Sequence, residues 1–116
     1  MTKRGVIVYV INNLNCSVPG LVNIMEPFSE SVWLELKLRG NDSLLLGCIY
    51  RSPNSTQDNN ANLMANINKV CEAKHFSHLL ICGDFNIPDI DWEHENTDKG
   101  DDSLAMKFIE CLRDCY

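Results

Sequence analysis

The order of elements in this sequence predicts a layered α/β fold, with helices packed on a sheet. Apolar runs typical of strands come first along the chain, and a helical pattern, a strand-like run and a second helical pattern follow. The length of 116 residues suits one small domain. A composition of 45% hydrophobic and 22% charged residues is typical of a globular protein.

Three strands are predicted in the first half of the chain. Residues 5–11 form a continuous apolar run, which predicts a buried strand. Residues 30–39 alternate, which predicts a half-buried strand with Val32, Leu34, Leu36 and Leu38 on one face and Trp33, Glu35, Lys37 and Arg39 on the other. The turn signal at 40–42 joins this strand to the apolar run 43–50, so the two are predicted to form an antiparallel hairpin.

The second half predicts two helices and one further strand. Residues 51–60 are polar and carry a proline, which predicts a loop. Helical spacing of apolar residues then predicts a helix at 61–73, and the apolar run 78–82 predicts a buried strand. Residues 93–102 are acidic and are predicted to be a mobile loop. The last helix is predicted from Leu104, Phe108, Ile109 and Leu112, which share one face. Asp101, Asp102 and Ser103 lie at its start, where they suit the positive end of the helix dipole.

Composition limits the partners and the compartment. A net charge of −6 argues against a broad basic surface for nucleic acid, although a bound divalent cation would supply the positive charge that phosphoester chemistry needs. No apolar run approaches the roughly 20 residues of a membrane span. The sequence shows no export signal, so we expect an intracellular protein that is not secreted. The even number of cysteines, six, allows disulfides, but an intracellular location favours free thiols.

The most informative motif follows the predicted strand at 78–82. Gly83-Asp84-Phe85-Asn86 places a carboxylate and a carboxamide two residues apart where a strand gives way to a loop. Asp84 can bind a hard cation or orient a water, and Asn86 can hold a phosphate oxygen without adding negative charge. The alternative is structural, because Asp and Asn after a strand are also ordinary turn formers.

A second polar motif follows the predicted strand at 43–50. Tyr50 and Asn54 lie where this strand ends, as Asp84 and Asn86 do for the later strand. If the two strands are neighbours with their ends at the same edge of the sheet, the four side chains converge. A phenol, two carboxamides and a carboxylate would suit a phosphate together with a metal-bound water.

The sequences LLGCIYRSPN at 45–54 and HLLICGDFNIPDIDW at 78–92 together resemble the endonuclease/exonuclease/phosphatase family. The closest likeness is to the endonuclease domain of non-LTR retrotransposon polyproteins, which are associated with a reverse transcriptase, and it covers nearly the whole chain. The resemblance implies a two-sheet α/β sandwich of the DNase I-like type and a Mg²⁺-dependent hydrolase that nicks DNA. It also implies action in the nucleus.

The resemblance assigns roles to the residues that match the motifs. Asp84 would orient and help deprotonate the attacking water, and it is the candidate metal ligand. Asn86 would hold the scissile phosphate, Tyr50 would contact that phosphate and stabilise developing charge, and Asn54 would bind substrate at the same edge. Asp89 and Asp91 receive no catalytic role, and Trp92 is expected to pack in the core.

The resemblance also defines an alternative, because it covers only the middle of the family's domain. The family uses an asparagine and a metal-binding glutamate upstream of Arg4, and an aspartate and a Ser-Asp-His sequence downstream of Tyr116. We therefore expect residues 1–116 to form a single partial domain, and the alternative to a nuclease is an inactive remnant that keeps the fold. A partial sandwich would leave sheet edges and apolar faces uncovered, which favours self-association.

A third reading is a cation-binding module built on the acidic residues that follow the strand at 78–82. Counted from Asp84, a calcium-binding loop of the EF-hand kind needs Asp or Asn at its fifth position, Gly at its sixth and Glu at its twelfth. Pro88 and Asp89 occupy the fifth and sixth positions, and only Glu95 fits. The members of this set are Asp84, Asn86, Asp89, Asp91, Glu93 and Glu95.

Overall fold

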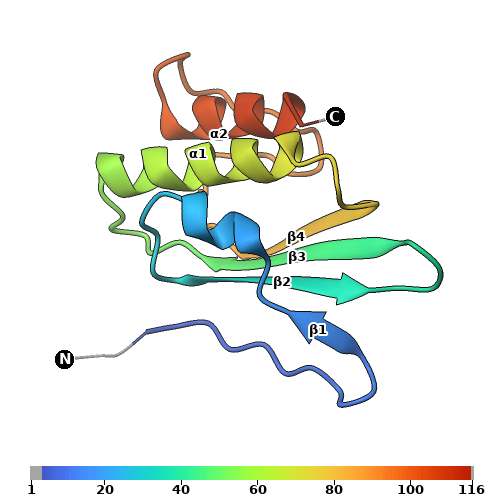
Figure 1. Ribbon diagram of the computed structural model, residues 1–116. Helices are drawn as coiled ribbons and strands as arrows, with labels where there is room; N and C mark the ends of the chain where they lie inside the picture. Colours follow the sequence, from blue (N-terminus) through green and yellow to red (C-terminus); the bar gives the residue numbers. More distant parts are fainter. Residues whose placement is uncertain (1–3, 116) are drawn as a thin grey trace.

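A mixed four-stranded sheet with two α-helices on one side makes up the computed structural model, which describes residues 4–115 (Figure 1). The elements are β1 Asn15–Ser17, the 3₁₀ helix η1 Gly20–Ile24, β2 Ser31–Lys37, β3 Ser43–Tyr50, α1 Gln57–Glu72, β4 His78–Asp84 and α2 Leu104–Arg113. The strand order is β1-β2-β3-β4, and only the β3–β4 pair is parallel. The α/β class is confirmed. The two-sheet sandwich stays a prediction, since residues 4–115 contain a single sheet.

The predicted hairpin is confirmed as β2 and β3, whose antiparallel register pairs Trp33 with Gly47. Gly40 in the connecting turn has φ +66°, a left-handed conformation that glycine adopts without steric cost. Burial in β2 does not follow the predicted alternation alone, because Trp33 and Leu36 are both buried although they belong to opposite faces. Gly47 explains the burial of Trp33: a side chain at 47 would collide with the indole ring.

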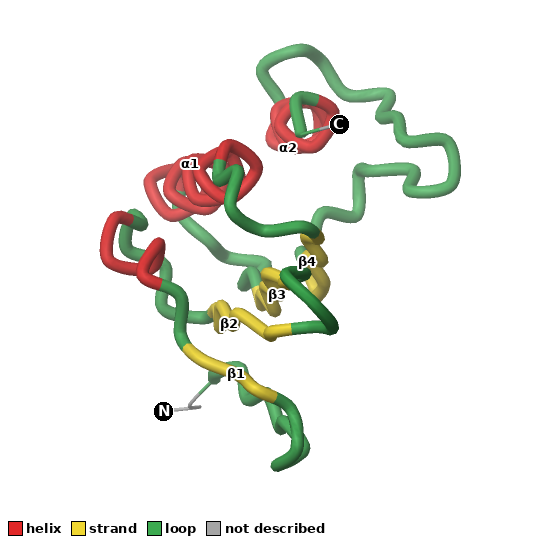
Figure 2. The backbone as a smooth tube through the Cα atoms, turned by 45° about the vertical axis from the view of Figure 1, so that its right-hand side comes forward, coloured by secondary structure: helices red, strands yellow, loops and turns green. Residues whose placement is uncertain are grey.

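The core lies between the sheet and the two helices. Figure 2, turned from the first view, shows α1 and α2 on the same side of the strands. Five large side chains of this core are at most 2% exposed: Leu45 and Ile49 of β3, Leu63 and Ile67 of α1, and Phe108 of α2. Both helices begin at capping side chains, since Thr56 accepts a hydrogen bond from Asn59 N and Ser103 accepts one from Met106 N. Neither helix of the described chain is long and apolar enough to cross a membrane.

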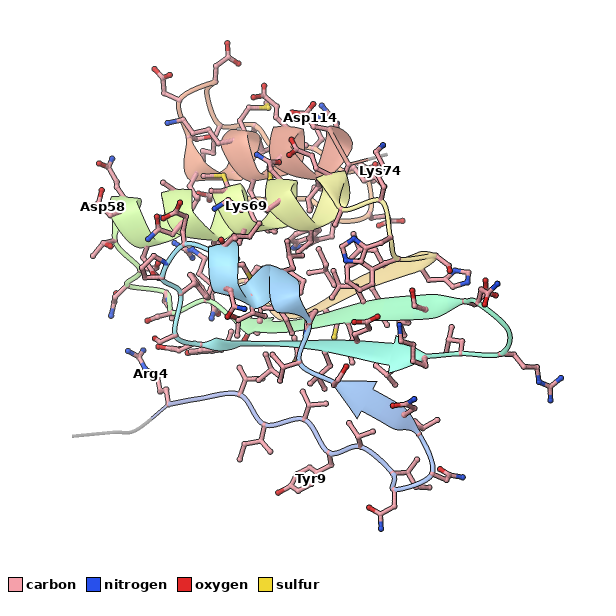
Figure 3. All side chains as sticks on the ribbon, viewed as in Figure 1. Arg4, Tyr9, Asp58, Lys69, Lys74 and Asp114 are labelled. Atoms are coloured by element: carbon pink, nitrogen blue, oxygen red, sulfur yellow. A yellow bond between two sulfur atoms is a disulfide. The ribbon has the colours of Figure 1, made fainter. Side chains whose placement is uncertain are left out.

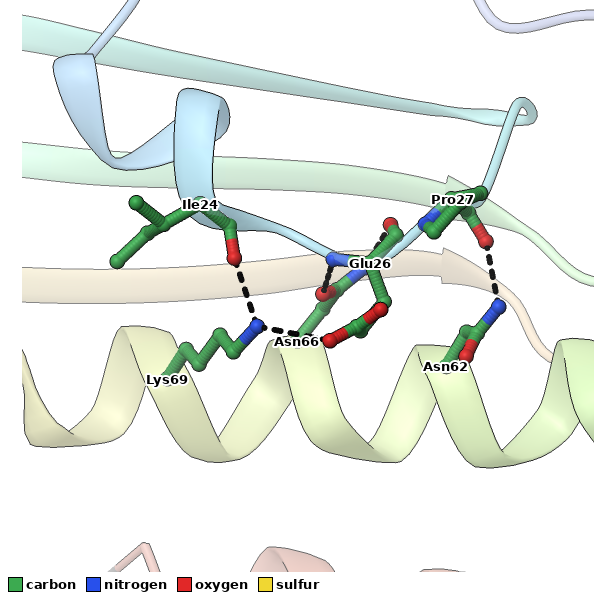
Figure 4. Close-up of polar contacts among 6 residues, drawn as sticks. All are labelled: Ile24, Glu26, Pro27, Asn62, Asn66 and Lys69. Carbon is green, nitrogen blue, oxygen red and sulfur yellow. Dashed lines mark hydrogen bonds and ion pairs between the residues drawn. The ribbon is translucent and has the colours of Figure 1, made fainter.

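Helix α1 is also attached to the chain before β2 through polar side chains (Figure 4). The amide of Asn66, 2% exposed, accepts from Glu26 N at 2.7 Å and donates to Glu26 O at 3.0 Å, as a paired strand would. Asn62 donates to Pro27 O, and Lys69 donates to Ile24 O. We call these three α1 side chains the polar seam. It provides hydrogen-bond partners for the backbone of a non-strand segment that lies beside α1.

The predicted buried strand at 5–11 is wrong. This segment is not paired as a strand, and Ile7, Tyr9 and Ile11 are 76%, 91% and 66% exposed. Figure 3 shows Tyr9 projecting away from the body of the protein. An apolar run forms a buried strand only where neighbouring strands cover both of its sides. Here the short polar strand β1, which we did not predict, occupies the edge of β2 instead.

The strand at 78–82 is confirmed as β4, but it is not buried. Its residues are mostly exposed, with Leu79 at 41% and Leu80 at 51%, because β4 is the last strand of the sheet in the described chain. The helix predicted at 61–73 begins one turn earlier, at Gln57, because the cap Thr56 lies within the predicted loop. The helix predicted near the end of the chain is confirmed as α2.

The expectation of free thiols is wrong for one pair. Cys71 at the end of α1 and Cys115 just after α2 form a disulfide, with their Cα atoms 5.5 Å apart. The pairing follows from helix packing, which brings the ends of α1 and α2 together, and sequence spacing does not reveal it. Cys111 is a buried free thiol beside this bridge, and its Sγ lies 3.4 Å from Asn68 Oδ1. Burial and the nearby Asp114 carboxylate raise the pKa of Cys111 to about 11.

Candidate functional site

The ends of β3 and β4 meet at one edge of the sheet, which is the condition under which the polar motifs were expected to converge. The parallel register pairs Tyr50 with Asp84, and Arg51 N donates to Asp84 O at 2.8 Å. Adjacent strands lie about 4.8 Å apart, so Tyr50 and Asp84 are side by side. Gly83 makes this approach possible: it has φ +145°, and a side chain there would collide with the carbonyl of Ile49. The glycine of the motif is therefore required by packing of the strand.

Arg51 and Asn86 connect the two loops at this edge. Arg51 is 4% exposed, and its guanidinium donates to Phe85 O at 3.2 Å, to Asn86 O at 3.0 Å and to Asn60 Oδ1 at 2.8 Å. Asn86 in turn donates its side-chain amide to Arg51 O at 2.7 Å. Asn86 has φ +50°, a left-handed conformation that asparagine tolerates better than most residues. The reciprocal bonds fix the backbone on which the Asn86 side chain is presented.

Sequence reasoning missed the role of Arg51. Its signal was present, because an arginine directly follows an apolar strand at the edge where the polar motifs converge. Burial lowers the pKa of Arg51, but a guanidinium stays protonated in proteins. The protein therefore keeps a buried positive charge behind the Asn86 loop, hydrogen-bonded to carbonyl and amide oxygens.

Asp84 has both a turn-forming and a solvent-facing aspect. Its Oδ1 accepts a hydrogen bond from Asn86 N at 3.1 Å, which is the side-chain bond of an Asx turn. The side chain is also exposed, so solvent and ligands reach the carboxylate. The turn-forming interpretation of this motif is thus correct, and it leaves the carboxylate accessible for chemistry.

A cavity of about 500 Å³ opens beside this edge. Its wall includes Asp84, Asn86, Phe85, Pro53, Pro88 and Trp92. Tyr50 and Asn54 are not among the lining residues, although Tyr50 lies beside Asp84 in the sheet. Asn54 is exposed in the loop after β3, where its backbone N–H bonds to Ser52 Oγ at 3.3 Å. Arg4, labelled in Figure 3, donates to the same hydroxyl at 2.7 Å. The structure therefore brings Asp84 and Asn86 to one cavity and places Asn54 outside its wall.

Trp92 is not a core residue, which corrects the sequence expectation. It is 51% exposed, and only part of its ring packs on Phe85 and Phe108, each with ring centroids 6.3 Å away. The core beneath it is already filled by Phe108, which is fully buried. The loop around Trp92 is closed by two backbone bonds between Asp91 and Asn96, of 2.7 and 3.1 Å.

Among the acidic residues after the motif, Asp91 forms hydrogen bonds within its own loop. The Asp91 carboxylate accepts from Glu93 N and His94 N and pairs with His94 Nδ1 at 2.8 Å. These hydrogen bonds, led by the one from the His94 side chain, lower the pKa of Asp91. Within residues 4–115 no three His, Cys, Asp or Glu side chains are grouped as a metal site would require.

Mg²⁺ often uses only one or two protein carboxylates and completes its shell with water and substrate phosphate. An exposed Asp84 at the mouth of a cavity fits that minimal contribution. The described residues thus provide one suitable ligand for such an ion.

Comparison with known proteins gives one match. A family model described as endonuclease-reverse transcriptase matches residues 44–115, which is more than half of the chain. The matched region runs from β3 to the residues just after α2 and includes Tyr50, Asp84 and Asn86. No curated protein and no solved structure matches the chain.

Proposed function

The chain belongs to the endonuclease-reverse transcriptase family, and on that premise we propose that the edge formed by β3 and β4 hydrolyses phosphodiester bonds of DNA with the help of Mg²⁺. The observation that carries the proposal is the parallel register, which pairs Tyr50 with Asp84. Asn86 lies two residues beyond Asp84 and is held there by Arg51. Three groups suited to phosphate chemistry therefore share one edge of the sheet.

Each side chain has a role that its chemistry allows. The exposed carboxylate of Asp84 orients the attacking water and accepts its proton. Asn86 uses one amide N–H to bind Arg51 O, so its second N–H is available to a phosphate oxygen. The phenol of Tyr50 donates a hydrogen bond to the oxygen on which negative charge develops. Asn54 would bind the substrate strand farther along the loop.

The proposed need for a metal ion is argued from charge. In a protein with a net charge of −6, bound Mg²⁺ would supply the positive charge that a phosphodiester needs. Asp84 would be its protein ligand. We extend the proposal to nuclear DNA as the substrate, since the family resemblance implies it.

Nicking of a supercoiled plasmid in the presence of Mg²⁺ tests the proposal. We expect the wild type to nick and Asp84→Ala to lose at least about 100-fold in rate, because it lacks the proton acceptor and metal ligand. Asp98→Ala is the matched control, since it removes the same charge from an exposed position in the acidic loop outside the edge. Equal nicking by wild type and Asp84→Ala would contradict the assignment of Asp84.

One observation favours the alternative of a domain that keeps this fold without catalysis. Asp84 is the single acidic side chain in the cavity wall, and the described chain groups no three metal ligands. Folded wild-type protein that, like Asp84→Ala, nicks no faster than a sample without protein would support this alternative. Circular dichroism of both proteins would establish that they are folded in that comparison.

A further inference from the structure

We propose that Trp92 forms a stacking wall for a nucleobase of the DNA strand whose phosphate lies at Asp84 and Asn86. This inference takes DNA as the ligand from the proposed function and rests on it in that respect. It adds a substrate-binding residue that the sequence assigned to the core. We use the name stacking wall for the three residues Trp92, Pro53 and Pro88, which are part of the lining of the cavity that also contains Asp84 and Asn86.

The first support is that one cavity holds both kinds of group. A base is attached to its own phosphate through a single sugar, so a strand bound at the carboxylate and amide must place a neighbouring base nearby. The cavity volume of about 500 Å³ is within the usual range for small-molecule sites. The rings of Trp92, Pro53 and Pro88 contribute apolar surface to this cavity.

The second support is that Trp92 is exposed and yet fixed. Its ring meets Phe108 edge-on, with an interplanar angle of 82°, and lies tilted by 37° to Phe85. The two backbone bonds between Asp91 and Asn96 brace the loop that carries it. An aromatic side chain held in place offers stacking surface with little loss of entropy on binding.

The third support is the charge around the wall. Asp84 lines the cavity and Asp89, Asp91 and Glu93 flank Trp92, with no lysine or arginine among the residues of the cavity wall in the described chain. The carboxylates of Asp89, Asp91 and Glu93 repel the phosphate backbone but not a neutral base. The surface is thus suited to the base side of a strand, and stacking on an aromatic ring accepts any base.

The test measures binding without turnover. A short single-stranded DNA oligomer of mixed sequence, carrying a fluorescent label, is mixed with the protein in EDTA. The anisotropy of the label reports binding for the wild type and every variant, and tryptophan emission is followed in the wild type. The chain has two tryptophans, and Trp33 is 6% exposed, so the change should come from Trp92. We expect saturable quenching of tryptophan emission in the wild type. The anisotropy of the labelled oligomer should show binding weakened about 5- to 150-fold by Trp92→Leu and largely kept by Trp92→Phe. Leu80→Ala, on the uncovered face of the sheet, is the control and should bind as wild type does.

A second arm needs no variant. An oligomer of the same length with abasic sites should bind the wild type about 5- to 150-fold more weakly, and Trp92→Leu should not distinguish the two oligomers. Equal binding of both oligomers by the wild type would overturn the proposal. So would Trp92 emission that changes with protein concentration alone, since a second copy would then cover the wall.

The two proposals fail separately. Saturable quenching of the wild type without plasmid nicking would support the wall and contradict catalysis. Nicking without any difference between wild type and Trp92→Leu in oligomer binding would support catalysis and overturn the wall.

Discussion

The two faces of the sheet are built from similar residues and have different surroundings. Leu45 and Ile49 of β3 point toward α1 and α2 and are 0% and 1% exposed. Leu80 and Cys82 of β4 point to the opposite face and are exposed, with Leu80 at 51%. Tyr50 and Asp84 belong to that opposite face by register. Tyr50 and Asp84 thus lie on the side of the sheet that the helices leave uncovered, and the helix layer packs on the other side.

The sharpest test of this difference is a matched pair of substitutions in one sheet. Leu45→Ala should lower the free energy of unfolding by about 2–5 kcal/mol, because it leaves a cavity in a filled core. Leu80→Ala should lower it by less than about 1 kcal/mol, because half of that side chain is already in water. Urea unfolding followed by circular dichroism gives both values. Equal losses would mean that the face carrying Leu80 is covered in solution.

The polar seam shows whether amide contacts support the covered side as much as apolar packing does. Asn66→Ala should lower the free energy of unfolding by about 2–4 kcal/mol, since it leaves the N–H and C=O of Glu26 without their partner. Asn62→Ala is the comparison. Asn62 is half-buried, and its replacement removes one solvent-exposed hydrogen bond, to Pro27 O, so this variant should lose less than about 1 kcal/mol. Similar values for the two variants would show that burial of the seam contributes little.

The smallest expected effect concerns pH and the thiol between the helices. Below pH about 8.5, the ordinary thiol pKa, Cys111 is protonated in both folded and unfolded chains, and its contribution to stability is complete. Above that pH the unfolded chain loses its proton first, because the folded pKa is about 11. Stability should therefore fall by about 1–2 kcal/mol as pH rises through this interval. The free energy of unfolding, measured in urea across this pH range, should change less with pH in Cys111→Ala than in Cys82→Ala, whose thiol is on the exposed face.

The parts of the fold that the sequence predicted are those set by local pattern. The hairpin of β2 and β3, both helices and the position of β4 follow from apolar periodicity, turn signals and capping residues. Burial was predicted less well, because it depends on what packs against an element. Residues 5–11 and β4 have the apolar composition of central strands, and neither has neighbours on both sides within the described chain.

The candidate site was predicted in its positions and not in its connections. The convergence of Tyr50 and Asp84 followed from two strand ends and is confirmed by the register. The bond from Asn86 to Arg51 O joins residues 35 positions apart, and no local pattern encodes it. Trp92 was misplaced for a related reason: the space that it was expected to fill is taken by Phe108 from a later helix.

The Cys71–Cys115 disulfide also makes part of the chain into a covalent ring. The two cysteines are 44 positions apart, so the ring contains β4, the loop with Asp84 and Asn86, the acidic segment and α2. Tyr50 lies outside it. A protease that cuts the exposed acidic segment would open the ring without releasing a fragment. The cut protein would then migrate as one species in electrophoresis until a reductant separates its two pieces.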